Sequence, residues 1–229
     1  MDLTILLPCL NEEKTLDETI KEIKIELKKF NIKSEILVVD NGSCDNSIKI
    51  ARENKVRIVR ENLKGYGSAL LTGIKNSQGK YIIFGDCDRS YHFENIEEYL
   101  SSLEQGYDIV IGSRYKGVME KDSMPFSHKY LGTPIITFLG RKLYKVPVSD
   151  FNSGLRGVNK EKILSINLNC MGMEFASEML IKGAKCNLKI KEIPINFYKD
   201  KRGRKPHLKA FRDGMRHLKI LLKELRKWN

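Results

Sequence analysis

The sequence has no paired cysteine motif and no long apolar run. Its five cysteines are an odd number without a C-x-x-C spacing: Cys9, Cys44, Cys87, Cys170 and Cys186. This pattern argues against a disulfide framework and against a zinc site, and it favours a reducing, cytosolic environment. The start, MDLTILLPCLNEE, lacks the positive residues and apolar segment of a signal peptide. No run approaches the roughly 20 apolar residues of a membrane span, so any membrane contact is expected from the surface.

Positive charge is concentrated near the end of the chain. Over 229 residues the formal net charge is +12, and residues 199–229 contribute twelve Lys and Arg against three Asp and Glu. A basic segment of this kind favours a polyanion, which could be phospholipid headgroups, nucleic acid or a substrate phosphate. The alternative is a basic surface that only contacts water. The length and the 41% apolar content are sufficient for one large domain with a substantial core.

Apolar strands and amphipathic helices alternate through the first half. We expect strands at residues 3–7, 35–40, 56–59, 81–84 and 108–111, with helices at 11–30, 46–54, 66–76 and 93–104. Continuous apolar strands separated by helices predict an α/β fold with a mostly parallel sheet covered by helices on both faces.

The most informative motif is GDCD, which directly follows the apolar run at 81–84. Asp86 and Asp88 are two residues apart, so both carboxylates leave the strand end on the same side. Oxygen ligands in this position suit a divalent cation that also binds diphosphate oxygens. An acidic turn is the alternative. Glu12 and Asp40 follow two other strands, and ligands of parallel sheets bind where such strand ends meet.

The second half is less regular. A loop is expected at 117–127, a helix or broken helix at 129–144 with a kink at Pro134, a strand at 155–158, a helix at 174–182, strands within 187–198 and a last helix at 206–228. One side of that last helix is apolar and the flanking sides are basic, which is typical of a helix in a membrane interface. Its apolar residues are Leu208, Phe211, Met215, Leu218, Leu222 and Leu225. A helix packed on the domain is the alternative.

Eight motifs in order resemble the family 2 glycosyltransferases of the GT-A fold, in the branch of dolichol- or polyprenyl-phosphate sugar synthases. They are PCLNEE, VVDNGSCD, KGYGSALLTG, GDCD, IGSRY, DFNSGLRG, GMEFASEM and IPINFYKDKRGRKPHL. The resemblance implies a GT-A domain over 1–205, with a nucleotide-binding half at 1–112 and an acceptor-binding half at 113–205, followed by a basic amphipathic helix at 206–229.

The resemblance also implies roles for individual residues. Asp86 and Asp88 would hold Mg²⁺ or Mn²⁺. The nucleotide sugar would be bound by Pro8, Asn11, Glu12, Asp40, Gly65, Gly67, Asp86 and Arg114. Catalytic roles would fall to Asp88, Asp150, Glu174 and Arg156, and the acceptor phosphate would meet Arg156, Arg202, Arg204 and Lys205. Glu178 is either part of the site or a surface acid.

The implied reaction is inverting transfer of a sugar from a UDP- or GDP-sugar to a polyprenyl or dolichyl phosphate. Many members carry transmembrane helices after this domain and none follows here. Either such a segment has been removed or, as we expect, the enzyme docks peripherally on an anionic membrane surface from the cytoplasm. A hydroxyl acceptor is the alternative, and it would need Asp150 or Glu174 as a base. Nucleic-acid binding by the basic segment is less favoured, because stacking aromatics are not interleaved with its charges. The sugar, the base and self-association into a homo-oligomer stay open.

Overall fold

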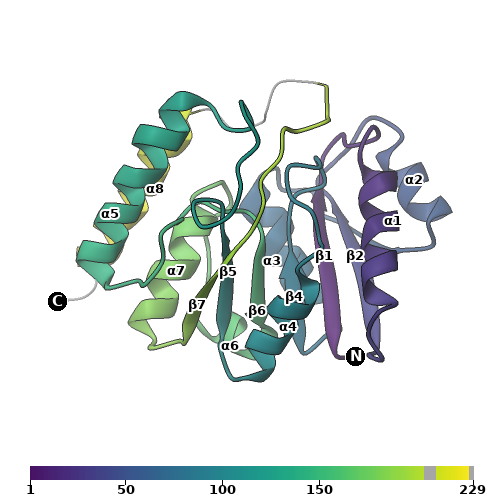
Figure 1. Ribbon diagram of the computed structural model, residues 1–229, viewed down its shortest axis with the longest axis horizontal. Helices are drawn as coiled ribbons and strands as arrows, with labels where there is room; N and C mark the ends of the chain where they lie inside the picture. The colour runs from purple at the N-terminus through teal and green to yellow at the C-terminus, as the bar shows by residue number, and fades with distance from the viewer. Residues whose placement is uncertain (204–209, 227–229) are drawn as a thin grey trace.

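A single mixed sheet organises the protein. The computed structural model describes residues 1–203 and 210–226. Its strands are β1 (Leu3–Cys9), β2 (Ser34–Asp40), β3 (Arg57–Arg60), β4 (Tyr81–Phe84), β5 (Ile109–Ser113), β6 (Arg156–Asn159) and β7 (Ile190–Pro194). They form a seven-stranded sheet in the order β3-β2-β1-β4-β6-β5-β7 (Figure 1). The predicted α/β class is confirmed.

The sheet is parallel except for β6. This strand is antiparallel to β4 and to β5, and it lies between them. Its register pairs Phe84 of β4 with Arg156 and Ile111 of β5 with the same residue. The sequence pattern indicated a strand here but not its position. β4 and β5 are consecutive strands along the chain, but β6 separates them in the sheet.

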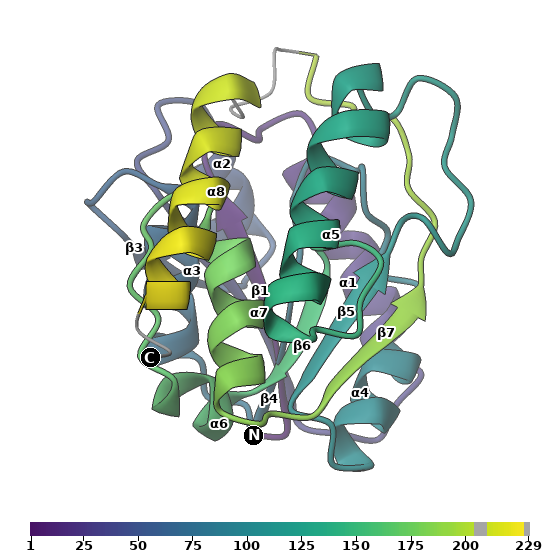
Figure 2. The ribbon, with the colours of Figure 1, turned by 90° about the vertical axis from the view of Figure 1, so that its left-hand side faces the viewer.

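Helices cover both faces of the sheet, as predicted (Figures 1 and 2). They are α1 (Leu16–Leu27), α2 (Ser47–Glu53), α3 (Tyr66–Asn76), α4 (Ile96–Glu104), a π-helical turn η1 (His128–Gly132), α5 (Thr133–Tyr144), α6 (Lys160–Ser165), α7 (Phe175–Lys185) and α8 (Ala210–Arg226). Side chains along β1 point alternately to the two faces of the sheet, so the core has two parts. Ile5 belongs to the part formed with α1, α2 and α4, whereas Leu6 belongs to the part formed with α3 and α5 to α8.

Three local differences from the predicted elements have simple causes. The first helix begins at Leu16 rather than near residue 11, because Asn11 has a φ of 58° and lies in a turn. Pro134 lies in the first turn of α5, where a missing N–H is tolerated, and η1 leads directly into that helix. The short helix α6 was not predicted; its cap is Asn159, whose side chain accepts a hydrogen bond from the Lys162 N–H.

The last helix, α8, buries both polar and apolar residues on its inner side and exposes apolar and basic residues on its outer side. It packs against α5 and α7 (Figure 2). Buried Asp213, His217 and Glu224 lie on the inner side together with Ile220 and Leu221. His217 Nδ1 lies 2.7 Å from Ser177 Oγ of α7, and burial lowers the pKa of the imidazole to about 4. Of the predicted apolar side, Met215, Leu222 and Leu225 are exposed.

None of the described helices combines the length and the apolar character that crossing a membrane requires.

Candidate active site

The site lies where β1 and β4 separate. β1 pairs with β2 as far as Cys9 and Asp40, but its pairing with β4 stops at Leu6 and Phe84. The chain runs outward from β1 through β2 to β3 and then returns to β4, so this is the point at which the order of a parallel sheet reverses. Ligands of α/β sheets bind in the crevice beyond such a point.

The loops after β1 and β2 hold each other by short polar contacts. The Asn11 side-chain oxygen accepts the Cys44 N–H at 2.7 Å, and the Asn11 N–H donates to Ser43 Oγ at 3.0 Å. Asp40 is buried and its Oδ1 accepts the Ser43 N–H at 2.8 Å. Pro8 lies on β1 beside this turn, opposite Val39 of β2. The predicted nucleotide-binding residues Pro8, Asn11 and Asp40 are therefore brought together.

Two glycines of the KGYGSALLTG motif allow a close approach of backbone segments. A Cβ atom at Gly65 would lie 2.1 Å from the Met171 carbonyl oxygen, and one at Gly67 would lie 2.2 Å from that of Cys170. Gly65 also has a φ of 149°. The close approach that requires these glycines is thus to the loop before α7, whereas the sequence interpretation assigned it to the nucleotide.

Asp86 and Asp88 follow β4 in different environments. Asp88 is buried, and its Oδ1 accepts hydrogen bonds from the Ser90 N–H at 2.9 Å and the Ser90 hydroxyl at 2.5 Å. Asp86 is half-buried next to Gly154, where an added Cβ would lie 2.8 Å from Asp86 Oδ2. Burial and the neighbouring Asp88 raise the pKa of Asp86 to about 6. The charge of Asp88 therefore makes ionisation of Asp86 more costly.

This pair of carboxylates fits a divalent cation. A cation would relieve the repulsion that raises the Asp86 pKa. Within residues 1–203 and 210–226, no group of three or more His, Cys, Asp or Glu is arranged to hold a metal. Mg²⁺ and Mn²⁺ do not need such a group, because substrate phosphates and water supply most of their ligands. One or two aspartates at a strand end are sufficient.

Arg114 and Asp150 form a buried, bidentate ion pair. Arg114 Nε lies 2.7 Å from Asp150 Oδ2, and its Nη2 lies 2.8 Å from Oδ1. Burial alone would lower the pKa of Arg114, but Asp150 holds it above its usual value. Asp150 has no exposed surface. The sequence interpretation gave these two residues separate ligands, and the structure joins them to each other.

Arg156 does not reach solvent. It is 1% exposed, and its guanidinium donates to the carbonyl oxygens of Ser153, Ala176 and Phe151 at 2.9, 2.7 and 2.9 Å. Burial lowers the pKa of this guanidinium to about 10. The predicted contact of Arg156 with an acceptor phosphate is therefore corrected: this side chain fastens the DFNSGLRG turn to α7.

The two acids of GMEFASEM have different surroundings. Glu178 is buried, and its carboxylate accepts the Asn169 and Cys170 N–H groups, the latter at 2.7 Å. Glu178 thereby orients the loop that packs on Gly65 and Gly67. The sequence had left open whether Glu178 is part of the site or a surface acid. Glu174 is half-buried; within the described residues its Oε2 has no hydrogen-bond donor, and Arg216 Nη1 lies 3.9 Å away.

Arg202 enters the site from the segment after β7. It donates to Asp88 Oδ2, and its Nη1 lies 3.6 Å from Glu12 Oε1. Glu12 is buried and its N–H donates to Ser47 Oγ at 2.8 Å. Arg204 and Lys205, the other predicted phosphate ligands, lie outside the described residues.

A family model for glycosyl transferase family 2 matches residues 4–165. The chain belongs to this family. The predicted resemblance to this family is confirmed.

Several curated relatives of this family 2 glycosyltransferase are at least 30% identical to it. The low-salt glycan biosynthesis hexosyltransferase Agl6 of Haloferax volcanii is 35% identical over 96% of the chain and 53% of its own length. A dolichol-phosphate mannosyltransferase of Pyrococcus furiosus is 30% identical over 97% of the chain and 64% of its own length. A UDP-N-acetylglucosamine–dolichyl-phosphate N-acetylglucosaminyltransferase of Methanococcus voltae is 33% identical over 83% of both. The chain thus spans about half of the length of Agl6 and somewhat less than two thirds of the length of the mannosyltransferase.

Solved structures support the fold of this glycosyltransferase. Glucosyl-3-phosphoglycerate synthase of Mycobacterium tuberculosis, in complex with Mn²⁺, UDP-glucose and phosphoglyceric acid, aligns with a TM-score of 0.77 at 19% identity. The alignment covers 98% of this chain and 79% of that one. The same synthase in complex with UDP alone aligns with a TM-score of 0.75.

Two functional candidates in this glycosyltransferase were not found from its sequence. Asn41 is buried and donates to the Glu61 and Leu63 carbonyl oxygens, while its own oxygen accepts the Gly65 N–H at 2.8 Å. Tyr66 has a buried hydroxyl beside Asp86, and burial together with Asp86 raises its pKa. The sequence gave no signal for these contacts, since an asparagine in a turn and a tyrosine at a helix start are common.

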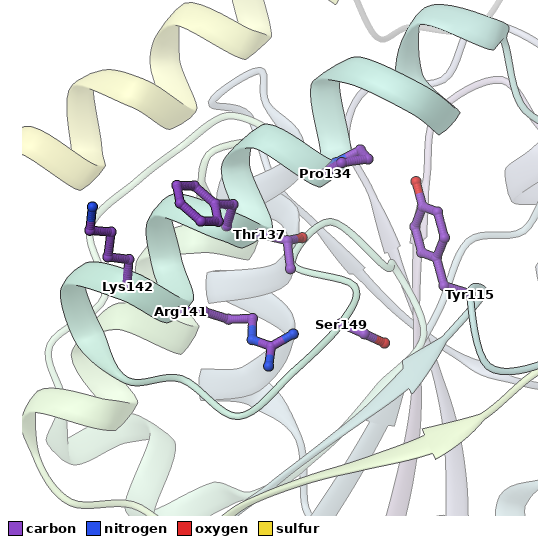
Figure 3. A pocket seen from close by; sticks show the side chains of 7 residues that line it. Tyr115, Pro134, Thr137, Arg141, Lys142 and Ser149 are labelled. Atoms are coloured by element: carbon purple, nitrogen blue, oxygen red, sulfur yellow. The ribbon is translucent and has the colours of Figure 1, made fainter.

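A groove of about 610 Å³ runs beside α5 (Figure 3). Tyr115, Pro134 and Phe138 give it apolar walls, and Arg141 and Lys142 are basic. Figure 3 shows Tyr115 and Pro134 toward one end and Arg141 toward the other, near the loop that carries Ser149. This groove combines aromatic and cationic walls on the same flank as α8.

Proposed function

We propose that this glycosyltransferase transfers a sugar from a UDP- or GDP-sugar to a polyprenyl or dolichyl phosphate, with inversion, at the cytoplasmic membrane surface. The observation that carries the proposal is the pair of carboxylates, Asp86 and Asp88, at the point where β1 and β4 separate. The names of two relatives, a dolichol-phosphate mannosyltransferase and a dolichyl-phosphate N-acetylglucosaminyltransferase, support the acceptor class.

The chemistry would consist mainly of aligning and neutralising anions. Asp86 and Asp88 would hold Mg²⁺ or Mn²⁺, which stabilises a departing nucleoside diphosphate when bound. A phosphate monoester is largely ionised at pH 7 and needs little help from a base. Arg202 would bind the phosphate of the acceptor, because a guanidinium offers a fixed fork of donors. Asn11, Glu12 and Asp40 would border the nucleotide.

The environment of Asp150 favours a phosphate acceptor over a hydroxyl. Both of its oxygens accept hydrogen bonds from Arg114, and the carboxylate has no exposed surface. A general base must lie within hydrogen-bond reach of the proton that it removes. Glu174 stays a candidate base for a hydroxyl acceptor, because its Oε2 has no hydrogen-bond donor among the residues that the structure describes.

We also propose that α5 and α8 face an anionic membrane. Phe138 of α5 is 61% exposed and Leu222 of α8 is 59% exposed, on helices that lie on the same flank (Figures 1 and 2). Basic residues accompany them: Arg141, Lys142, Arg212, Lys219, Lys223 and Arg226. Exposed apolar residues with basic neighbours suit the interface of an anionic bilayer. The groove beside α5 could then take the first apolar units of the acceptor.

The donor is tested by ligand-dependent thermal stability. We expect one nucleotide, UDP or GDP, to raise the melting temperature only when Mn²⁺ or Mg²⁺ is present, because Asp86 and Asp88 would hold the metal and the metal would neutralise the diphosphate. The matching nucleotide sugar and a short-chain polyprenyl phosphate should then give a lipid-linked product. Transfer to a sugar hydroxyl and not to the lipid phosphate would overturn the acceptor assignment.

Membrane docking is tested by flotation with vesicles that contain phosphatidylglycerol. Replacing Leu222 and Leu225 by Ser should lower the bound fraction several-fold, since each buried leucine contributes about 1.5–3 kcal/mol. The matched control replaces Ile25 and Leu63, which are 61% and 62% exposed outside α5 and α8. Equal loss in both variants, or binding to duplex DNA and not to vesicles at physiological salt, would overturn the assignment.

A further inference from the structure

Residues 195–203 run across the turn that carries Asp88. Backbone hydrogen bonds hold this segment, which we call the strap. Among them, the Phe197 N–H donates to the Val118 carbonyl at 2.9 Å, the Tyr198 N–H to that of Ser90 at 3.0 Å and the Lys201 N–H to that of Asp88 at 2.9 Å. Figure 1 shows it rising from β7 toward the upper edge of the sheet. The backbone of the strap therefore contacts the same turn that would bind the metal.

The strap places one guanidinium among three carboxylates. Arg202 donates to Asp88 Oδ2, its Nη1 lies 3.6 Å from Glu12 Oε1, and its Nε lies 3.7 Å from Asp200 Oδ1. The side chain is 14% exposed. Burial opposes its charge, yet Asp88 and Glu12 raise the pKa of Arg202 above its usual value. The guanidinium is thus a permanent positive charge at the predicted metal site.

An internal cation is needed at this site on electrostatic grounds. The charge of Asp88 disfavours ionisation of Asp86, and the positive charges of Arg202 and Arg114 offset this effect. Arg114 is fully engaged with Asp150. Among the described residues, Arg202 is therefore the guanidinium that contacts Asp88 directly.

We propose that Arg202 and the divalent metal occupy the Asp88 carboxylate alternately. Arg202 already donates to Asp88 Oδ2, and a hard cation and a guanidinium cannot use one oxygen along the same direction. Metal entry would release Arg202 from Asp88 while the backbone of the strap stays attached to the turn. The freed guanidinium would then lie within a side chain's length of the phosphates. This inference rests on the metal site of the proposed function. It adds that Arg202 competes with the metal for the Asp88 carboxylate before substrate binds.

The test is the affinity for Mn²⁺ without nucleotide, measured at pH 8 by the loss of the free-ion EPR signal. Arg202→Gln should bind Mn²⁺ about tenfold tighter than the wild type, because the metal no longer has to displace a charge-assisted hydrogen bond. Mn²⁺ should also raise the melting temperature of this variant by more than that of the wild type. Arg202→Lys, which keeps the charge without the fork, should fall between them.

Lys201→Gln is the matched control. Lys201 is exposed, so the change removes the same charge one position away without touching Asp88 Oδ2, and its Mn²⁺ affinity should equal that of the wild type. If Arg202→Gln binds Mn²⁺ no tighter than Lys201→Gln, while nucleotide with Mn²⁺ still stabilises the wild type, this inference is wrong and the proposed function stands. If Mn²⁺ stabilises neither protein even with nucleotide, the metal site itself is wrong.

Discussion

Replacing Asp88 by Asn is expected to abolish metal-dependent nucleotide binding and to lower the rate of sugar transfer about 10³-fold. A bound metal contributes several kcal/mol of charge stabilisation, and each 1.36 kcal/mol corresponds to a tenfold change in rate. The fold should persist, because an Asn Oδ1 can still accept the two hydrogen bonds that Ser90 donates to Asp88. Transfer rates and the melting temperature with and without Mn²⁺ measure the two effects.

Asp200→Asn is the control for Asp88→Asn. Asp200 also lies near Arg202, at 3.7 Å from Nε, but it belongs to the strap and not to a strand end. The substitution Asp200→Asn removes one negative charge from the same surroundings. We expect its transfer rate to stay within about threefold of the wild type, because Asp200 is not a predicted metal ligand. Metal-dependent stabilisation that survives in Asp88→Asn would contradict the assignment of the metal site.

The strand ends could be predicted because each is a local pattern. An apolar run followed by polar residues identifies the end of β1, β2 or β4 without knowledge of the neighbours, and the rule for parallel sheets then brings Glu12, Asp40 and Asp88 to one edge. The structure places all three there, and Arg202 links Glu12 to Asp88.

The partners of the arginines could not be predicted, because they depend on pairings between distant residues. Arg114 and Asp150 are 36 positions apart, and Arg202 and Asp88 are 114 apart. These contacts follow from the order of the strands in the sheet and from the course of the segment after β7, which no periodicity encodes. An isolated Arg in a motif has the same sequence signature whether it binds a phosphate, a carboxylate or, as Arg156 does, the backbone.

The same reasoning explains the mixed result for α8. The regular spacing of its apolar residues could be recognised in the sequence, and the exposed Met215, Leu222 and Leu225 lie on the apolar side that this spacing predicted. The inner side was missed because it mixes polar and apolar residues: Asp213, His217 and Glu224 are buried there together with Ile220 and Leu221. A helix normally buries its most apolar side. The apolar residues that α8 leaves exposed are therefore the basis for the proposed membrane contact.

Replacing Asp150 by Asn is expected to destabilise the fold rather than to remove a base. The change leaves the guanidinium of Arg114 buried without a counter-charge, and breaking a buried ion pair in this way costs about 3–5 kcal/mol. The free energy of unfolding, measured by urea denaturation, should fall by that order. Transfer to a lipid phosphate, expressed per folded molecule, should stay close to that of the wild type.

The matched change is Glu174→Gln, which also removes one carboxylate charge beside the site. Because Glu174 Oε2 has no hydrogen-bond donor among the described residues, its loss should alter the stability by no more than about 0.5 kcal/mol. Replacing Arg114 by Met and Asp150 by Leu together should recover most of the stability, since an apolar pair removes the unpaired charge. A stable Asp150→Asn enzyme with a 10²- to 10⁴-fold slower turnover would contradict this account, because that is the effect of losing a general base.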